Sequence, residues 1–359
     1  VLEVFFMKTI YCITGANGHL GNVLVQKLCL LGHQVRALML PGDQSHLAPC
    51  PQLTIYQGNI CEQDTLTAFF DCPPDSELVV IHAAGIVSIA SKVQRNVYDV
   101  NVNGTKNIIA MCLAHRVRRL VHVSSVHALK EQRQGCWIYE QTKFDPAHVV
   151  GAYAKTKAEA TQAVLDSVEQ GLDAVIVHPS GILGPFDYGH GHLTQMVEDY
   201  LNGRLKACVR GGYDFVDVRD VADGIIAAAE KGKKGACYIL SNHYMPVEDL
   251  LYLVHKVSGK RPIRIVLPMW FAKGTAGLSE LYYKLLHQKP LYTSYSLYTL
   301  TSNGLFCHDK ATEELGYQPR PLIETVEDTA TFLYAEGRIH DKKHRLMLKQ
   351  PAHLQSMLP

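Results

Sequence analysis

Short apolar runs alternate with amphipathic stretches over the first half of the chain. The apolar runs predict strands, and the stretches between them predict helices with one apolar face. The predicted strands cover residues 8–13, 34–39, 53–57, 78–82, 119–123 and 173–178. The predicted helices include 19–31, 62–70, 93–115 and 152–170. Apolar strands separated by helices indicate a parallel sheet covered on both faces, and right-handed crossovers then give a doubly wound α/β (Rossmann-type) fold.

The pattern changes after about residue 181. Helix-like stretches follow without regular alternation with strands, at 192–203, 246–257, 269–287 and 322–335. We therefore expect a sheet domain and a smaller, mostly helical substrate domain. The sheet domain is predicted to take residues 7–180 and about 212–240, with the segment 215–230 returning to the sheet. The substrate domain takes about 181–211 and 241–340, and residues 341–359 are a tail.

Composition excludes several classes of function. The 359 residues are 47% hydrophobic and 19% charged, as in an ordinary globular protein. Because 35 basic residues face 34 acidic ones, a net charge of +1 gives no reason to expect nucleic acid or an anionic membrane as partner. No apolar run reaches the ~18–20 residues of a membrane span. The partner we expect is a small-molecule substrate.

Cysteine and histidine usage points to a cytoplasmic protein without a metal. The ten cysteines form no CxxC pair and most lie in apolar runs, which favours reduced core thiols over disulfides. No HExxH motif is present among the 18 histidines, so no metal site is predicted. The first strand begins just after Met7, which leaves no room for a secretion signal. Residues 1–6 are either foreign to the native chain or an extension of that strand.

A glycine-rich stretch, TGANGHLG (14–21), directly follows the first predicted strand. It permits two interpretations: a plain tight turn into a helix, or a nucleotide pyrophosphate bound at the amino end of that helix. In the second, Gly15 permits the turn, Gly18 lets the backbone approach the phosphates, and Gly21 lets the helix pack on the strand. Spacing alone does not decide between the two.

Two further motifs supply candidate chemistry. In YAKTK, Tyr153 and Lys157 share one helix face, where a lysine ammonium is expected to pull the phenol pKa from ~10 toward neutrality. Ser124 and Ser125 end the fifth predicted strand, at the carboxyl edge where ligands bind in such sheets. The alternatives are two exposed helix residues and a serine that only caps a turn. The order of the three motifs along the chain favours the catalytic interpretation.

That order resembles the extended short-chain dehydrogenase/reductase family, which includes sugar epimerases, dehydratases, dihydroflavonol reductases and hydroxysteroid dehydrogenases. The resemblance covers about residues 8–338. Further stretches carry it: GNICE (58–62), IHAAG (81–85), NVNGTKNII (101–109), HPSGILGP (178–185), FVDVRDVADG (215–224) and LFCHDKATEELGYQPR (305–320).

Matched position by position, the resemblance implies that Ser125, Tyr153 and Lys157 are the catalytic residues. His127 and Ile182 are the implied substrate contacts, and His178 stands where the family more often has arginine. The implied cofactor contacts are Gly15, Asn17, Gly18, His19, Leu20, Gly21, Met39, Asn59, Ile60, Ala83, Ala84, Gly85, Asn101, Tyr153, Lys157, His178, Pro179, Ser180 and Gly181. The implied mechanism is hydride transfer, with Tyr153 exchanging the proton, Ser125 binding the substrate oxygen and Lys157 also holding the ribose.

The branch of the family is inferred from two segments. Residues 178–195 contain few of the asparagines and arginines that hold a nucleotide diphosphate, and Val126-His127 replaces the Asp-Glu pair of dehydratases. Residues 270–300, rich in Tyr, Leu and Ala, suit either an apolar pocket for a ring-shaped alcohol or ketone, or ordinary core packing. We expect a ketone or alcohol oxidoreductase. The alternatives are a nucleotide-sugar epimerase or dehydratase and a non-catalytic cofactor-sensing regulator.

Cofactor choice and assembly complete the expectations. Sites selective for NAD usually place an acid at the end of the second strand, but Met39 stands there, and Leu40 stands where NADP sites often have arginine. Arg36 is expected to point away. The cofactor is therefore NADP or NAD with weak discrimination and a slight preference for NADP. A homodimer through the helices 93–115 and 152–170 is also expected, with apolar contacts from Val97, Val100, Ile108, Met111, Ala160 and Val164, although burial within one subunit would also explain these side chains.

Overall fold

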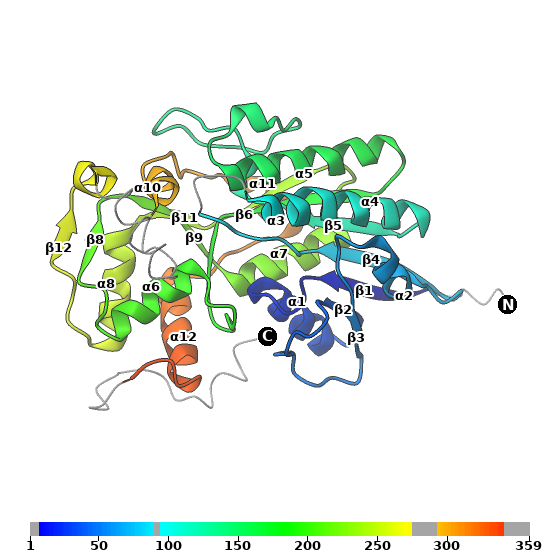
Figure 1. The fold of residues 1–359 in the computed structure, drawn as a ribbon, viewed down its shortest axis with the longest axis horizontal. Coiled ribbons are helices and arrows are strands. Elements are labelled where there is room, and N and C mark those ends of the chain that lie inside the picture. The colour runs from blue at the N-terminus through cyan, green and yellow to red at the C-terminus, as the bar shows by residue number, and fades with distance from the viewer. Residues whose placement is uncertain (1–6, 90–93, 275–292, 341–359) are drawn as a thin grey trace.

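The computed structural model describes residues 7–89, 94–274 and 293–340, and its centre is a seven-stranded sheet (Figure 1). The strand order is β10-β6-β5-β4-β1-β2-β3, and every neighbouring pair is parallel. In chain order the strands are β1 (Lys8–Thr14), β2 (Gln34–Met39), β3 (Leu53–Gln57), β4 (Ser76–His82), β5 (Arg119–Val123), β6 (Ala174–Pro179) and β10 (Cys237–Leu240). The predicted doubly wound fold is confirmed; β10, a short strand, was not predicted from the sequence.

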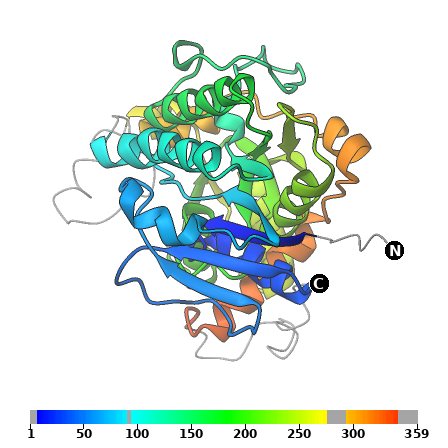
Figure 2. The same ribbon diagram turned by 90° about the vertical axis from the view of Figure 1, so that its right-hand side faces the viewer.

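Helices cover both faces of the sheet (Figures 1 and 2). α1 (His19–Leu30) and α7 (Val218–Lys231) lie on one face, and α4 (Thr105–Ala114) and α5 (Ala152–Glu169) lie on the other. Because side chains alternate along a strand, Ile13 of β1 enters the core under α1 and α7, and Cys12 enters the core under α4 and α5. Burial on both faces explains why the inner strands are mainly apolar, whereas the edge strand β3 is largely exposed.

The segment between β4 and β5 is more irregular than predicted. Part of the single predicted helix 93–115 lies outside the described residues, because residues 90–93 are not described. From residue 95 the segment consists of α3 (Arg95–Tyr98), a π-helical stretch over Asp99–Gly104, and α4. A π-helical bulge in a helix often marks a functional position, and this one contains Asn101. The predicted helix 62–70 is likewise divided, into a 3₁₀ turn (Gln63–Leu66) and α2 (Thr67–Phe70).

The second half of the chain contains short strands as well as helices. β7 (Gly181–Leu183), β9 (Gly212–Asp217) and β11 (His243–Pro246) form one small sheet, and β8 (Ala207–Val209) pairs with β12 (Ile265–Leu267). The helices are α6 (His192–Leu201), α8 (Val247–Ser258), α10 (Ser294–Thr299), α11 (Asp309–Leu315) and α12 (Leu322–Ala335). A mostly helical region was expected here, but its short strands were not identified from the sequence, because strands of three to six residues carry too little periodicity to be seen.

The segment 215–230 also differs from its prediction. Its strand, β9, pairs with β7 and β11 and not with the central sheet, and only α7 packs against that sheet. The strand that returns to the central sheet is β10. Most of the predicted helix 269–287 falls outside the described residues, although residues 269–274 are helical. The division into two domains stays a prediction.

Candidate active site

The glycine-rich turn lies between the end of β1 and the start of α1, at the carboxyl edge of the central sheet. Gly15 has a φ of +67°, and a Cβ there would lie 2.7 Å from the Cα of Ala84. A Cβ on Gly21 would lie 2.1 Å from the carbonyl oxygen of Gly15. Gly18 is different, because its Cβ would meet only that same oxygen, at 3.2 Å. Gly15 and Gly21 are thus required by close packing, whereas Gly18 leaves the outer side of the turn open.

The amino end of α1 has the properties of an anion site. The first amides of a helix have no intrahelical acceptor, and here the N-cap is Gly18, which offers no side chain. No acidic residue lies in the first turn of this 12-residue helix. β1 and β4 are neighbours at the point where the strand order reverses, which is where ligands bind in doubly wound sheets. These residues fit a dinucleotide pyrophosphate.

A loop after β2 approaches this turn. The side chain of Asn17 donates to the carbonyl oxygen of Gln44 (2.9 Å) and accepts from the backbone amide of His46 (3.1 Å). His46 stacks on Tyr188, with ring centroids 4.5 Å apart and an interplanar angle of 2°. The imidazole of His19 is 2.9 Å from the carbonyl oxygen of Pro185. Asn17 and His19 therefore join the turn to its surroundings through their side chains, and Leu20 beside them is half-buried.

Residues expected near the adenosine lie at the ends of β2 and β3. Met39 is buried, and its carbonyl oxygen accepts from the amide of Gly58 (2.9 Å). The side chain of Asn59 is engaged locally, since it donates to Glu62 (2.9 Å) and accepts from the amide of Cys61 (3.0 Å). Ile60 is buried against the π-helical stretch, because a Cβ on Gly104 would lie 2.6 Å from it. A contact of Asn59 with adenine would thus use its backbone or require its amide to turn.

Tyr153 and Lys157 lie one turn apart near the start of α5, and both are buried. Ser125 follows β5, and its hydroxyl is hydrogen-bonded to Tyr153. The ammonium Nζ of Lys157 donates to the carbonyl oxygen of Val123, 2.9 Å away. A Cβ on Gly85 would lie 3.4 Å from Nζ. The fold therefore brings Ser125, Tyr153 and Lys157 together beside the loop after β4. Ser124 is not part of this group, because its hydroxyl pairs with that of Thr161 (2.6 Å).

The electrostatics of this group differ from the sequence expectation. Burial raises the pKa of Tyr153 to about 12, and the hydrogen bond from Ser125 opposes that rise. Burial also lowers the pKa of Lys157 to about 8. The expectation that Lys157 brings the Tyr153 pKa toward neutrality was wrong for this arrangement, because the ammonium is turned to the Val123 carbonyl and desolvation of the phenolate dominates. Tyr153 is therefore a protonated acid at neutral pH.

Asn101 holds the loop that follows β4. Its Oδ1 accepts from the amide of Ile86 (2.8 Å), and its Nδ2 donates to the Ile86 carbonyl (3.0 Å) and to the Thr156 hydroxyl (3.1 Å). Thr156 in turn donates to the carbonyl oxygen of Tyr153 (2.8 Å). Ala83, Ala84 and Gly85 therefore lie in a loop fixed between the glycine turn and the helix that carries Tyr153.

His127 is the centre of an aromatic group that was not predicted from the sequence. Its Nε2 is 3.0 Å from the hydroxyl of Tyr213, and its Nδ1 is 3.4 Å from the hydroxyl of Tyr295. Its ring centroid is 5.9 Å from that of Tyr153. Burial lowers the pKa of His127 to about 4, so the imidazole is neutral. Tyr295 lies in the Tyr-rich stretch 270–300, but no local signal marked Tyr213, on β9. Ile182, on β7, is half-buried.

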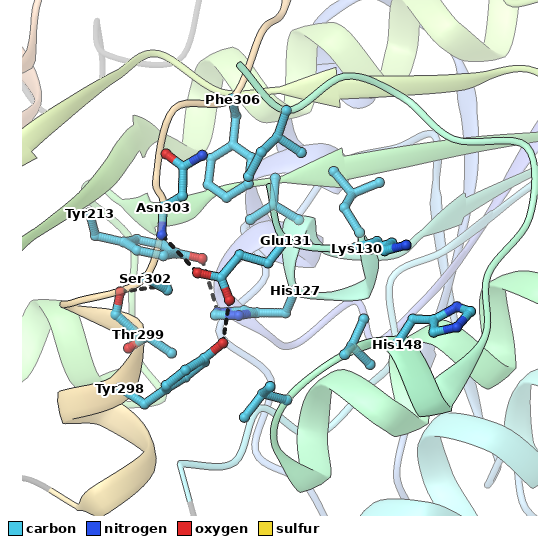
Figure 3. Close-up of a pocket in the computed structure, with 15 residues that line it drawn as sticks. His127, Lys130, Glu131, His148, Tyr213, Tyr298, Thr299, Ser302, Asn303 and Phe306 are labelled. Atoms are coloured by element: carbon cyan, nitrogen blue, oxygen red, sulfur yellow. Dashed lines mark hydrogen bonds between the residues drawn. The ribbon is translucent and has the colours of Figure 1, made fainter. Parts of the chain in front are cut away.

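A cavity of about 150 Å³ adjoins His127 (Figure 3). Tyr298 donates to one oxygen of Glu131, and the other accepts from the backbone amide of Asn303 (3.1 Å). Apolar side chains complete the wall, among them Leu129, Ile138, Val149, Val150 and Phe306. Since His127 lines this cavity and its ring also contacts that of Tyr153, the cavity is a candidate for the substrate side of the site. Among the described side chains, no cluster of three His, Cys, Asp or Glu residues suited to a metal ion occurs.

The last predicted cofactor segment comprises the end of β6 and the residues that follow it. His178 Nδ1 is 3.0 Å from the carbonyl oxygen of Ser125, and burial lowers the His178 pKa to about 4. A neutral imidazole here cannot make the ion pair that arginine would make. Pro179 ends β6, and the hydroxyl of Ser180 donates to Asp214 (2.5 Å). Gly181 is required by packing, because a Cβ there would lie 2.9 Å from the carbonyl oxygen of Asp214.

Asp214 provides a test of this segment through pH-dependent stability. Burial raises its pKa to about 7, while hydrogen bonds from Ser180 and the amide of Asn242 oppose the rise. A folded-state pKa above the unfolded value means that stability falls as pH rises from about 4 to 7. Asp214→Asn should flatten that decline and be more stable than wild type above pH 7, by up to about 4 kcal/mol at ~1.4 kcal/mol per pKa unit. Urea unfolding of both proteins at several pH values measures this, and parallel curves would contradict it.

Comparison with known proteins gives consistent matches. A model of the NAD dependent epimerase/dehydratase family matches residues 11–241. Sterol demethylase protein B of Methylococcus capsulatus is 28% identical over 331 residues, which cover 91% of this chain and 99% of that protein. Human 3 beta-hydroxysteroid dehydrogenase type 7 is 27% identical over 358 residues, with coverages of 87% and 92%. The crystal structure of gox2253 has a TM-score of 0.80 at 30% identity, with coverages of 92% and 99%. The similarity thus extends over nearly the whole chain.

Proposed function

Because the chain belongs to the NAD dependent epimerase/dehydratase family and is an enzyme of the extended short-chain dehydrogenase/reductase type, we propose that it interconverts a ketone and a secondary alcohol with NAD or NADP. The observation that carries the proposal is the buried group of Ser125, Tyr153 and Lys157 beside an open glycine turn. The turn fits a dinucleotide, and the buried group fits proton exchange with a carbonyl oxygen.

Each residue of the group has a distinct part in this proposal. Tyr153, protonated because its pKa is raised, gives its proton to the oxygen of a ketone as that oxygen gains negative charge. Ser125 donates a second hydrogen bond to the same oxygen and stabilises the developing charge. In the reverse direction the phenolate form of Tyr153, the form left after the forward proton transfer, takes the proton from the alcohol. When bound, the nicotinamide ring of the cofactor supplies or accepts the hydride.

The cofactor would be held by groups at the carboxyl edge of the sheet. The turn with Gly18 and the first turn of α1 offer backbone amides to the pyrophosphate. Lys157 offers its ammonium to the ribose hydroxyls beside Gly85. Ser180 and its neighbours in the segment after β6 would line the nicotinamide. A rigid cradle of this kind positions the reacting atoms before the chemical step.

Lys157→Ala should weaken cofactor binding and lower turnover together, because the Lys157 ammonium is proposed to serve both the ribose and the buried proton-exchanging group. We expect at least a tenfold loss in each, about 1.4 kcal/mol or more. Lys155→Ala is the matched control, since Lys155 is an exposed lysine on the same helix. Fluorescence titration with NADH and NADPH measures binding. A Lys157→Ala protein with normal cofactor affinity would refute the dual role.

Discrimination between NAD and NADP is proposed to be weak, with a slight preference for NADP. Met39 ends β2 without an acid, and Arg36 is turned away, because its guanidinium donates to the carbonyl oxygens of Phe69 (2.9 Å) and Asp71 (2.5 Å). Asp43, in the following loop, would oppose a phosphate. Titration of wild type with both reduced cofactors should give affinities within tenfold, about 1.4 kcal/mol. A hundredfold preference would show that another residue reads the 2′ position.

The proposed substrate is a ring-shaped or small ketone or alcohol. The group of His127, Tyr213 and Tyr295 is aromatic but carries hydroxyl and imidazole groups, and His127 and Tyr213 line the cavity. This suits an apolar ring with one or two polar substituents. The names of sterol demethylase protein B and of 3 beta-hydroxysteroid dehydrogenase type 7 support a sterol-like class. A nucleotide sugar is the alternative substrate, and it would need polar partners for its diphosphate.

Assembly and location stay predictions within this proposal. Five of the six apolar side chains expected at a dimer interface are buried within one subunit: Val97, Ile108, Met111, Ala160 and Val164. They therefore give no support to a homodimer, which now depends on the family resemblance alone. The ten cysteines are all unpaired, which supports a reducing compartment such as the cytoplasm. In the described ranges, no helix combines the length and apolar character that a bilayer crossing requires.

A further inference from the structure

A buried row of polar side chains lies across the sheet, on the face covered by α4 and α5. Thr14 of β1 and His82 of β4 are register partners, and the Thr14 hydroxyl is 2.8 Å from His82 Nδ1. On the other side of the ring, His82 Nε2 is 3.0 Å from the hydroxyl of Thr105. All three side chains are at most 2% exposed. The catalytic proposal above does not use this row.

The hydrogen bonds of the row fix the position of every proton. Thr105 donates its only hydroxyl hydrogen to the carbonyl oxygen of Asn101, 2.7 Å away, so it must accept a hydrogen from His82 Nε2. Burial lowers the pKa of His82 to about 3, so the ring is neutral and carries one N–H. Nδ1 is then an acceptor, and Thr14 donates to it. The Thr14 oxygen in turn accepts from the amide of Ala84 (3.2 Å).

The two ends of this hydrogen-bonded row hold the same loop, the one that follows β4. At one end, Thr14 precedes the glycine turn and binds Ala84, whose backbone crosses closely over Gly15. At the other end, Thr105 donates to the backbone carbonyl of Asn101, and the side chain of Asn101 makes two hydrogen bonds to the backbone of Ile86. The loop between them contains Gly85, beside the Lys157 ammonium.

We propose that His82, as its Nε2–H tautomer, is a positioning residue for the dinucleotide site. By orienting the Thr14 and Thr105 hydroxyls in opposite directions, it fixes the loop after β4 between the glycine turn and Asn101. This role rests on the proposed function, because it is expressed through cofactor binding. His82 itself need not touch the cofactor or the substrate.

The neighbouring His122 provides a matched control. It is the register partner of His82 on β5, it is 1% exposed, and its ring centroid lies 5.4 Å from that of His82. Neither of its ring nitrogens has a hydrogen-bond partner in the described part of the chain. Replacement of either histidine by leucine disturbs the same packed layer, but only the change at His82 breaks the row of hydrogen bonds that holds the loop after β4.

The first experiment compares His82→Leu with His122→Leu in cofactor titrations and thermal unfolding. We expect His82→Leu to weaken NADH and NADPH binding at least tenfold, and His122→Leu to stay within twofold of wild type. Thr105→Val should also weaken binding, and the double variant with His82→Leu should lose less than the product of the two single effects. Equal losses of affinity in His82→Leu and His122→Leu would overturn the proposal.

The second experiment does not depend on cofactor binding or on a variant that folds. Nitrogen-15 NMR of wild type labelled in its histidine rings reports the tautomer of each buried imidazole. The hydrogen-bonded row requires His82 to be neutral with its hydrogen on Nε2. A hydrogen on Nδ1 would overturn the proposal. If wild type binds neither reduced cofactor, the proposed function fails, and the positioning role fails with it, whereas the tautomer still decides whether the hydrogen-bonded chain exists.

Discussion

Tyr153→Phe should lower turnover by about 10²–10⁴-fold, the range typical of a positioned general acid or base. The substitution removes only the hydroxyl that is hydrogen-bonded to Ser125 and that gives its proton to the substrate oxygen. The phenyl ring keeps the packing against His127. Cofactor affinity should therefore remain nearly unchanged, which separates the effect from that of Lys157→Ala.

The measurement is steady-state turnover together with fluorescence titration of NADH and NADPH. Tyr11→Phe is the matched control, because Tyr11 is another buried tyrosine and lies in β1, on the face of the sheet opposite α5. It should retain wild-type turnover. If Tyr153→Phe keeps more than about a tenth of the wild-type rate, Tyr153 is not the proton-exchanging group.

Arg219→Met should destabilise the fold strongly. Arg219 is 1% exposed, and its guanidinium makes two hydrogen bonds to Asp217, at 2.9 and 2.7 Å, and one to Asp328, at 2.7 Å. It thereby joins the start of α7 to α12. Removal of the guanidinium leaves the carboxylate of Asp217, which is fully buried, without its main cation.

Breaking a buried pair in this way costs about 3–5 kcal/mol of unfolding free energy. Urea unfolding followed by circular dichroism measures it. Arg118→Met is the control, because the ion pair of Arg118 with Glu77 (2.7 Å) is partly exposed and is expected to contribute less than about 1 kcal/mol. A loss below about 1 kcal/mol in Arg219→Met would show that this network does not stabilise the fold.

The central sheet was predictable because its signal is local. The strands are short, mainly apolar runs, and β2, β3 and β5 have the bounds that the sequence predicted. The short strands β7, β8 and β12 have three residues each, too few for a period to appear. β10 is also short, with four residues. It pairs with β6 at the edge of the sheet, although the two strands are far apart in the sequence.

The proposed catalytic residues could be named from motifs, but their environment could not. Spacing placed Tyr153 and Lys157 on one helix face, whereas the direction of the Lys157 ammonium depends on the Val123 carbonyl of a different element. The His127 group joins β9, α10 and the turn after β5, so its contacts span more than 80 residues of sequence. Pairings of this kind follow from topology and leave no pattern in a local stretch.

The central claim, hydride exchange between a nicotinamide cofactor and a carbonyl carbon with Tyr153 as acid, is tested most directly by isotope transfer. Wild type is incubated with NADH or NADPH that carries deuterium at nicotinamide C4 and with a panel of cyclic ketones, and the products are analysed by mass spectrometry. We expect an alcohol that carries one deuterium on its carbinol carbon, and almost none with Tyr153→Phe. Turnover of a nucleotide sugar, with no deuterium transferred to any ketone of the panel, would contradict the account.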